Sequence, residues 1–101
     1  MNPMQQMLAQ AKKIERELKN AHAELAQKEF VVKKAGIIEV TVSGDKTIKG
    51  IKIEADALSA DNKEMIEDTL LMAIKEAMEQ VQAESDAIDE RITGQKGAFG
   101  F

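Results

Sequence analysis

The sequence predicts an α+β fold in which a long N-terminal helix, a three-stranded antiparallel meander and a long C-terminal helix follow one another (α-β-β-β-α). Three observations lead to this prediction. Apolar residues form a heptad pattern over residues 4–25, three β-rich segments separated by glycine-containing turns lie between residues 30 and 53, and a helical apolar periodicity covers residues 62–92. The length of 101 residues favours one domain, expected over residues 1–93, followed by a flexible Gly-rich tail over residues 94–101.

The first predicted helix carries one continuous apolar stripe. Its members alternate in steps of three and four and fill the a and d positions of three heptads: Met4, Met7, Ala11, Ile14, Leu18, Ala21 and Leu25. Asn2 is the predicted N-cap, and Pro3 suits the first turn. At ~1.5 Å per residue the stripe is roughly 30 Å long, so it must lie against a partner helix or a second copy of the chain. In a chain of this size we expect a homodimer.

The opposite face of this helix is basic. Four cations fall at the outer b, c and f positions of the heptad: Lys12, Lys13, Arg16 and Lys19. Three carboxylates flank the stripe at e and g: Glu15, Glu17 and Glu24. Two interpretations stay open at this point, a helix whose cations are simply solvated and a basic ridge presented to a polyanion. Lys33 and Lys34, at the first predicted turn, would extend such a ridge.

Three strands and two turns fit residues 30–53. Residues 30–34 and 37–42 read directly as strands, and Gly36 between them is able to adopt a positive φ. Residues 47–53 place isoleucines on both faces, a conflict that a bulge at Lys49 and Gly50 resolves. The predicted register then pairs Val42 with Ile48, Val40 with Ile51, Ile38 with Ile53 and Glu39 with Lys52. The register of the first strand stays open.

The second long helix is expected from about residue 62 to residue 92. Its inner stripe consists of Ile66, Leu70, Ala73, Ile74, Ala77, Val81, Ile88 and Ile92. The first half should be buried on two sides, against the sheet and against a partner, because further apolar residues widen the stripe there: Met65, Leu71, Met72 and Met78. The second half is expected to project into solvent with its acidic residues Glu84, Asp86, Asp89 and Glu90. Gly94 is the predicted helix stop.

Composition argues against catalysis, cofactors and membranes. The chain has no cysteine, which excludes disulfides and thiolate chemistry, and its one histidine, His22, has no second histidine or cysteine to share a metal with. We interpret His22, beside the apolar stripe, as a residue of the surface or of an interface edge. No catalytic constellation is visible, and we expect no enzyme activity, no cofactor, no metal and no small-molecule substrate. Without a signal peptide or an apolar run of membrane-spanning length, we expect a cytoplasmic protein that does not enter membranes.

Charge is distributed unevenly along the chain. The net charge is −4, yet residues 1–53 carry ten Lys or Arg and six Asp or Glu, whereas residues 54–101 carry four and twelve. Such asymmetry indicates two surfaces with different uses. Screening acts over ~8 Å at 0.15 M salt, so a local basic ridge can attract phosphate despite a distant acidic helix.

The ordered set of elements and segments resembles the YbaB/EbfC family of bacterial nucleoid-associated proteins. The resembling segments are Met-Asn-Pro-Met-Gln-Gln-Met (1–7), Gly-Ile-Ile-Glu-Val-Thr-Val-Ser-Gly (36–44), Ile-Lys-Ile-Glu (51–54), Asp-Asn-Lys-Glu-Met-Ile-Glu-Asp (61–68) and the Gly-rich end (94–100). The resemblance implies a homodimer that binds double-stranded DNA, helps to organise the nucleoid, and affects gene expression and DNA protection. It supplies no catalytic residue and no defined DNA-contact motif.

Two functions from different classes follow. In the first, a homodimer binds double-stranded DNA with weak sequence specificity through Lys12, Lys13, Arg16 and Lys19, extended by Lys33 and Lys34. The absence of Tyr and Trp argues against a platform for single strands or RNA. In the second, the heptad helix is the seam of a coiled-coil adaptor or scaffold that binds a protein partner.

Overall fold

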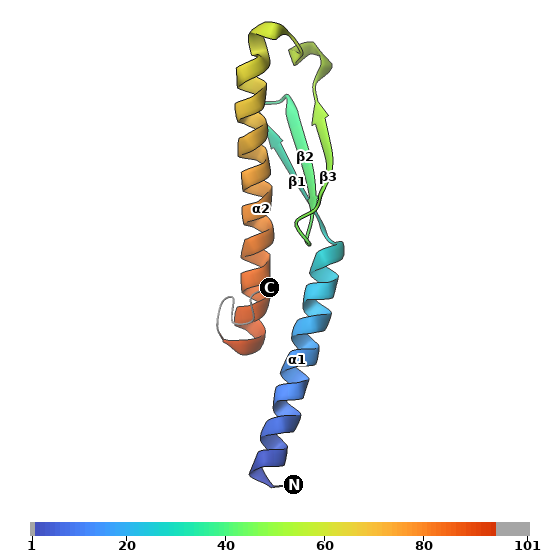
Figure 1. Ribbon diagram of the computed structural model, residues 1–101, viewed down its shortest axis with the longest axis vertical. Helices are drawn as coiled ribbons and strands as arrows, with labels where there is room; N and C mark the ends of the chain where they lie inside the picture. Colours follow the sequence, from blue (N-terminus) through green and yellow to red (C-terminus); the bar gives the residue numbers. More distant parts are fainter. Residues whose placement is uncertain (1, 95–101) are drawn as a thin grey trace. The chain divides into compact units, whose positions relative to one another are not determined.

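The computed structural model describes residues 2–94 and has the predicted order of elements (Figure 1). Helix α1 (Pro3–Gln27) leads into strands β1 (Glu29–Lys34), β2 (Ile38–Ser43) and β3 (Ile48–Ile53). Two short 3-10 turns, η1 (Ala55–Ala57) and η2 (Ala60–Asn62), then precede helix α2 (Lys63–Thr93). The α-β-β-β-α fold is thereby confirmed. The predicted tail lies, except for Gly94, outside the described residues.

Two compact units divide the chain, and α2 contributes to both. One unit contains α1 as far as Leu25 together with the end of α2 from Ala83 onward, and the other contains residues 26–82. The second unit thus holds the whole sheet and the first two-thirds of α2.

The sheet is an antiparallel meander in the order β1-β2-β3. The predicted register of β2 and β3 is confirmed, including the irregularity that leaves Lys49 without an opposite residue. The structure also fixes the first strand, whose Phe30 lies opposite Val42 and whose Val32 lies opposite Val40. The buried apolar side chains of β1 and β2 therefore share one face, which we call the inner face. The three isoleucines of β3 lie on the same face, opposite Val42, Val40 and Ile38.

The inner face forms the core of this unit with α2. Its buried strand residues are Phe30, Val32, Ile38, Val40 and Val42, and α2 buries Ala73, Ala77 and Val81. Spacings of four keep the three α2 residues on one side of the helix, and the two alanines leave room for a close approach. Figure 1 shows α2 running alongside the strands.

Cover over the inner face is incomplete. Ile48 and Ile51 on β3 stay 43% and 44% exposed, although their neighbours on β2 are buried. On α2, Leu71 and Met72 are exposed as well. Within the single chain the sheet covers only one side of the first half of α2, and the burial of its other side against a partner stays a prediction.

Three local predictions are confirmed: Asn2 caps α1, Gly36 adopts a positive φ in the first turn, and Gly94 ends α2. The Asn2 side chain accepts a hydrogen bond from the backbone N–H of Gln5 (2.8 Å), and the Gln5 side chain accepts one in return from the backbone N–H of Asn2 (3.3 Å). Gly36 has a φ of 69° and its neighbour Ala35 one of 54°, both in the left-handed region. Gly94, with a φ of 82°, ends α2.

The heptad stripe of α1 is buried only near its C-terminal end. Leu18 and Leu25 are buried, whereas Met4 and Met7 are each 71% exposed. The N-terminal half of the stripe is thus an apolar surface that this single chain does not cover.

Candidate nucleic-acid interface

The four cations of α1 lie together on its exposed face. Each of Lys12, Lys13, Arg16 and Lys19 is exposed, and we call this set the basic ridge. Lys13 approaches Glu17 at 4.0 Å, with both side chains about half or more exposed. An ion pair of this kind is worth little in water, so it leaves the Lys13 ammonium available to a phosphate.

Lys33 and Lys34 point to opposite faces of β1. Successive side chains of a strand alternate, and Lys33 shares the outer face with Glu39, which lies opposite it on β2. Lys34 lies on the inner side and forms an ion pair with Glu76 of α2 at 2.6 Å. Lys33 is therefore presented to solvent, whereas the Lys34 ammonium ties β1 to α2.

Two exposed cations on β3, Lys49 and Lys52, were not among the site residues predicted from the sequence. Lys52 lies opposite Glu39 on the outer face, and Lys49 is the extra residue at the irregularity in the strand. Both are exposed. The signal that could have identified them is the run of lysines that alternates with isoleucine along residues 48–53.

The turn between β2 and β3 is held by a carboxylate. Asp45 accepts hydrogen bonds from the Ser43 hydroxyl and from the Thr47 backbone N–H, the latter at 3.0 Å. These hydrogen bonds, from Ser43 first and then from Thr47, lower the pKa of Asp45 below its usual value. Lys46 in the same turn has a φ of 67°, and its ammonium donates to the Gln82 side chain of α2 at 2.6 Å.

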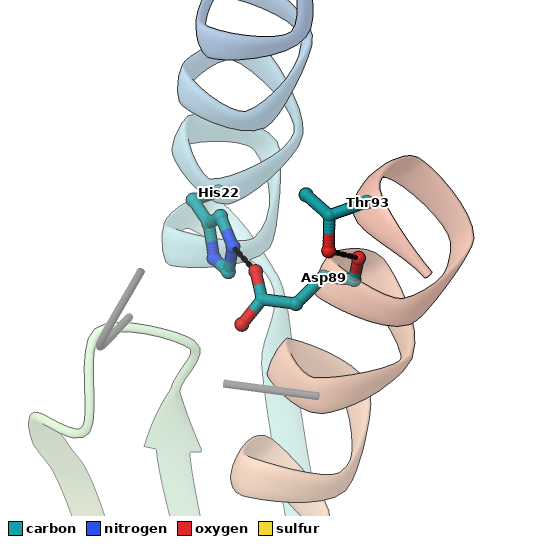
Figure 2. Close-up of polar contacts among 3 residues, drawn as sticks. All are labelled: His22, Asp89 and Thr93. Atoms are coloured by element: carbon teal, nitrogen blue, oxygen red, sulfur yellow. Dashed lines mark hydrogen bonds and ion pairs between the residues drawn. The ribbon is translucent and has the colours of Figure 1, made fainter. Parts of the chain in front are cut away.

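His22 and Asp89 form a pair inside the unit that contains α1 and the end of α2. Figure 2 shows the His22 ring directed at the Asp89 carboxylate, with 2.7 Å between His22 Nε2 and Asp89 Oδ1. The Asp89 side chain is 0% exposed and that of His22 is 11% exposed. The Thr93 hydroxyl, one turn later, donates to the Asp89 backbone carbonyl at 2.6 Å.

These positions decide one expectation and correct another. Of the two interpretations of His22, the structure agrees with the interface edge, because the ring contacts α2 and its side chain is 11% exposed. Asp89, contrary to expectation, does not project into solvent with Glu90. The physical reason is that α1 and the end of α2 belong to one compact unit, in which Asp89 lies on the same side of α2 as buried Ser85. A carboxylate in such a place needs a hydrogen-bonding partner, and His22 provides one.

Neither a metal centre nor a membrane segment is found in the described part of the chain. Residues 2–94 contain no group of three or more His, Asp or Glu side chains that could hold a metal ion. Within the same residues, neither helix combines the length and the apolar character needed to cross a bilayer.

The geometry described so far is that of a small α-β-β-β-α protein with an exposed cationic helix. A family model described as the YbaB/EbfC DNA-binding family matches residues 1–96. The chain therefore belongs to the YbaB/EbfC DNA-binding family.

Curated relatives and a solved structure agree with this placement. A nucleoid-associated protein of Lachnospira eligens is 39% identical over 79 residues, which are 77% of this chain and 68% of the relative. One from Enterococcus faecalis is 30% identical over 102 residues, covering 100% and 96% of the two chains. An uncharacterized protein of Helicobacter pylori, HP0035, matches in structure with a TM-score of 0.76 over 90% of this chain and 97% of the other, at 14% identity. That likeness shows the fold.

Proposed function

We propose that this protein is a nucleoid-associated homodimer that binds double-stranded DNA with weak sequence specificity, through the phosphates and without any chemical step. The observation that carries the proposal is the basic ridge: four cations, Lys12, Lys13, Arg16 and Lys19, all exposed on one helix of a protein that belongs to a DNA-binding family. The names of the curated relatives support a place in the nucleoid.

Phosphate contact explains why an acidic protein can bind DNA. The acidic residues are concentrated in the second half of the sequence, whereas the ridge lies in the first half. Contacts to phosphates position a protein on the duplex but carry no sequence information, so the expected binding is broad. Lys33 extends the proposed surface as an exposed cation, and Lys34 does so only if it leaves Glu76.

Exposed apolar side chains on β3 and α2 support the homodimer. Lys46 in the turn between β2 and β3 contacts Gln82, so the Gln82 side of α2 is the side next to that turn. Leu71 precedes Gln82 by eleven residues, or about three turns, and therefore lies on the same side. Leu71 is 67% exposed, and Ile48 and Ile51 on the inner face of β3 are 43% and 44% exposed. A second copy that covers this surface would remove it from water, and a two-fold axis would double the basic ridge.

A salt titration on duplex DNA tests the proposal. The purified protein is titrated onto a duplex of arbitrary sequence at several salt concentrations, and its mass in solution is measured in parallel. Each phosphate neutralised should add about 0.9 to the slope of log K against log[salt]. A dimeric mass and a steep slope are expected, whereas salt-independent binding or the absence of binding contradicts the proposal.

A matched pair of double variants locates the surface. Lys12→Ala/Lys19→Ala removes two cations from the ridge, and Lys63→Ala/Lys75→Ala removes two exposed cations from α2. Both double variants change the net charge equally, so long-range electrostatics alone would weaken binding equally. We expect a loss of affinity and of salt slope for the ridge variant only. Equal losses would show that the ridge is not the contact surface.

The second function predicted from the sequence, a coiled-coil adaptor, has one observation in its favour. The exposed Met4 and Met7 leave part of the heptad stripe open to a helix of another protein. Recovery of one stoichiometric protein after nuclease treatment, with no affinity of the purified chain for DNA, would favour this alternative.

A further inference from the structure

The pair formed by His22 and Asp89 has no role in the proposed contact with DNA, yet it is the most deeply buried ionisable arrangement among residues 2–94. The Asp89 carboxylate is 0% exposed and uses one oxygen, Oδ1, for the 2.7 Å contact with His22 Nε2. Its other oxygen, Oδ2, is buried and has no hydrogen bond within the described part of the chain. A carboxylate held in this way depends strongly on the imidazole.

The neighbours of the pair are mostly apolar or small. On α1, Leu18 and Leu25 are buried four residues before and three residues after His22, so they share its side of the helix. On α2, buried Ser85 lies one turn before Asp89. Apolar residues at the two polar positions would hold the helices together at least as well, because a buried polar or ionic pair contributes little net stability once its desolvation is counted. What a directional hydrogen bond adds is one defined rotation of α1 about its axis.

Rotation of α1 decides where the basic ridge points. The ridge ends at Lys19, three residues before His22, and begins at Lys12, about 15 Å from the pair at ~1.5 Å per residue. Every described residue of α1 before Ile14 is exposed. The contacts around His22 therefore orient the ridge within this unit.

We propose that His22 and Asp89 are positioning residues for DNA binding, whose hydrogen bond fixes the rotation of α1 at which the basic ridge meets the phosphates. This inference rests on the proposed function. Loss of the pair leaves every cation of the ridge in place but lowers the fraction of molecules with the ridge correctly oriented. The apparent Kd rises as that fraction falls, and we expect an increase of about tenfold.

Two single variants separate positioning from simple electrostatics. Asp89→Ala removes a negative charge, so long-range electrostatics predicts tighter binding to DNA, whereas the positioning role predicts weaker binding. Glu90→Ala makes the same change of charge at the next residue, which is exposed, and should leave binding equal to or slightly tighter than that of the wild type. Asp89→Asn keeps an oxygen that can accept from the imidazole N–H, and should retain most of the affinity that Asp89→Ala loses.

A double variant separates positioning from stability. His22→Leu/Asp89→Leu replaces the pair by apolar side chains, which should preserve or raise the thermal stability. We expect its affinity for the duplex to stay about tenfold below that of the wild type while its helix content by circular dichroism is unchanged. Wild-type affinity in this double variant, or in Asp89→Ala, would overturn the inference. If the wild type itself does not bind DNA, the proposed function fails instead, so the two failures are distinguishable.

Discussion

The one-sided cover of the sheet can be tested with two valines on adjacent strands. Val40 on β2 faces α2 and is 0% exposed, whereas Val31 on β1 points to the outer face and is 47% exposed. The substitutions Val40→Ala and Val31→Ala remove the same two methyl groups. The difference between them therefore reports mainly the difference in burial, which includes the central position of β2 and the edge position of β1.

The expected magnitude follows from the methyl groups. At about 0.8 kcal/mol for each buried methyl group, Val40→Ala loses about 1.6 kcal/mol of transfer free energy. The cavity left between β2 and α2 raises the total destabilisation to about 2–3 kcal/mol. Val31→Ala, already half in water, should lose about 1 kcal/mol or less. Since 1 kcal/mol shifts Tm by about 4–8 °C in a domain of this size, the two variants should differ by roughly 10 °C.

Thermal and urea unfolding followed by far-UV circular dichroism measures the difference. The protein concentration must be equal for all samples, because a dimer gains stability with concentration. Equal destabilisation by the two substitutions would refute the assignment of a covered inner face and a wet outer face. So would a larger loss from Val31→Ala.

Three further outcomes are expected. Because its hydrogen bonds lower the pKa of Asp45, the ionised carboxylate stabilises the fold at pH values above the ordinary Asp pKa. This contribution is lost as the pH falls through the lowered pKa. Asp45→Asn should therefore flatten the dependence of Tm on pH in the acid range. A Cβ at Gly36 or at Gly50 would meet no atom within 4 Å, but only Gly36 has a positive φ. Gly36→Ala should thus destabilise by about 1–2 kcal/mol in urea unfolding, whereas Gly50→Ala should not. Ile51→Lys should lower the mass measured by light scattering to that of a monomer, and Val31→Lys, at a position of equal exposure on the outer face, should leave a dimer.

The register of β2 and β3 was predictable because of one glycine. The isoleucines of β3 change parity between Ile48 and Ile51, and the bulge that reconciles them fits best at Lys49 and Gly50. The first strand offers no such constraint. Its two consecutive valines, Val31 and Val32, suit either face, so only the three-dimensional packing decides which is buried.

The burial of His22 and Asp89 was not predictable from periodicity. Asp89 lies near the end of a helix rich in acidic residues, a pattern that indicates a solvated face. The pattern carries no information on His22, which lies on another helix and is 67 residues away in sequence. The heptad stripe is a second case in which the sequence pattern does not decide burial within one chain. A sequence repeat marks Met4 and Leu18 as equivalent, yet within one chain only Leu18 has neighbours that bury it.

The exposure of the candidate cations on α1 was predictable from the sequence. Heptad positions placed all four ridge cations on the exposed face, where the structure also has them. The sequence grouped Lys33 with Lys34 because they are adjacent, but the alternation of side chains along β1 sends them to opposite faces. Whether these cations contact DNA is the question that the paired lysine variants address.

The single imidazole of the chain is also a natural spectroscopic probe. With three Phe and no Tyr or Trp, the aromatic region of a proton NMR spectrum contains few other signals. Resonances of the one histidine ring, packed against the end of α2, would therefore report the docking of α1 in the unlabelled protein. Their line widths and chemical shifts during a titration with DNA would show whether α1 is already docked against the end of α2 in the free protein.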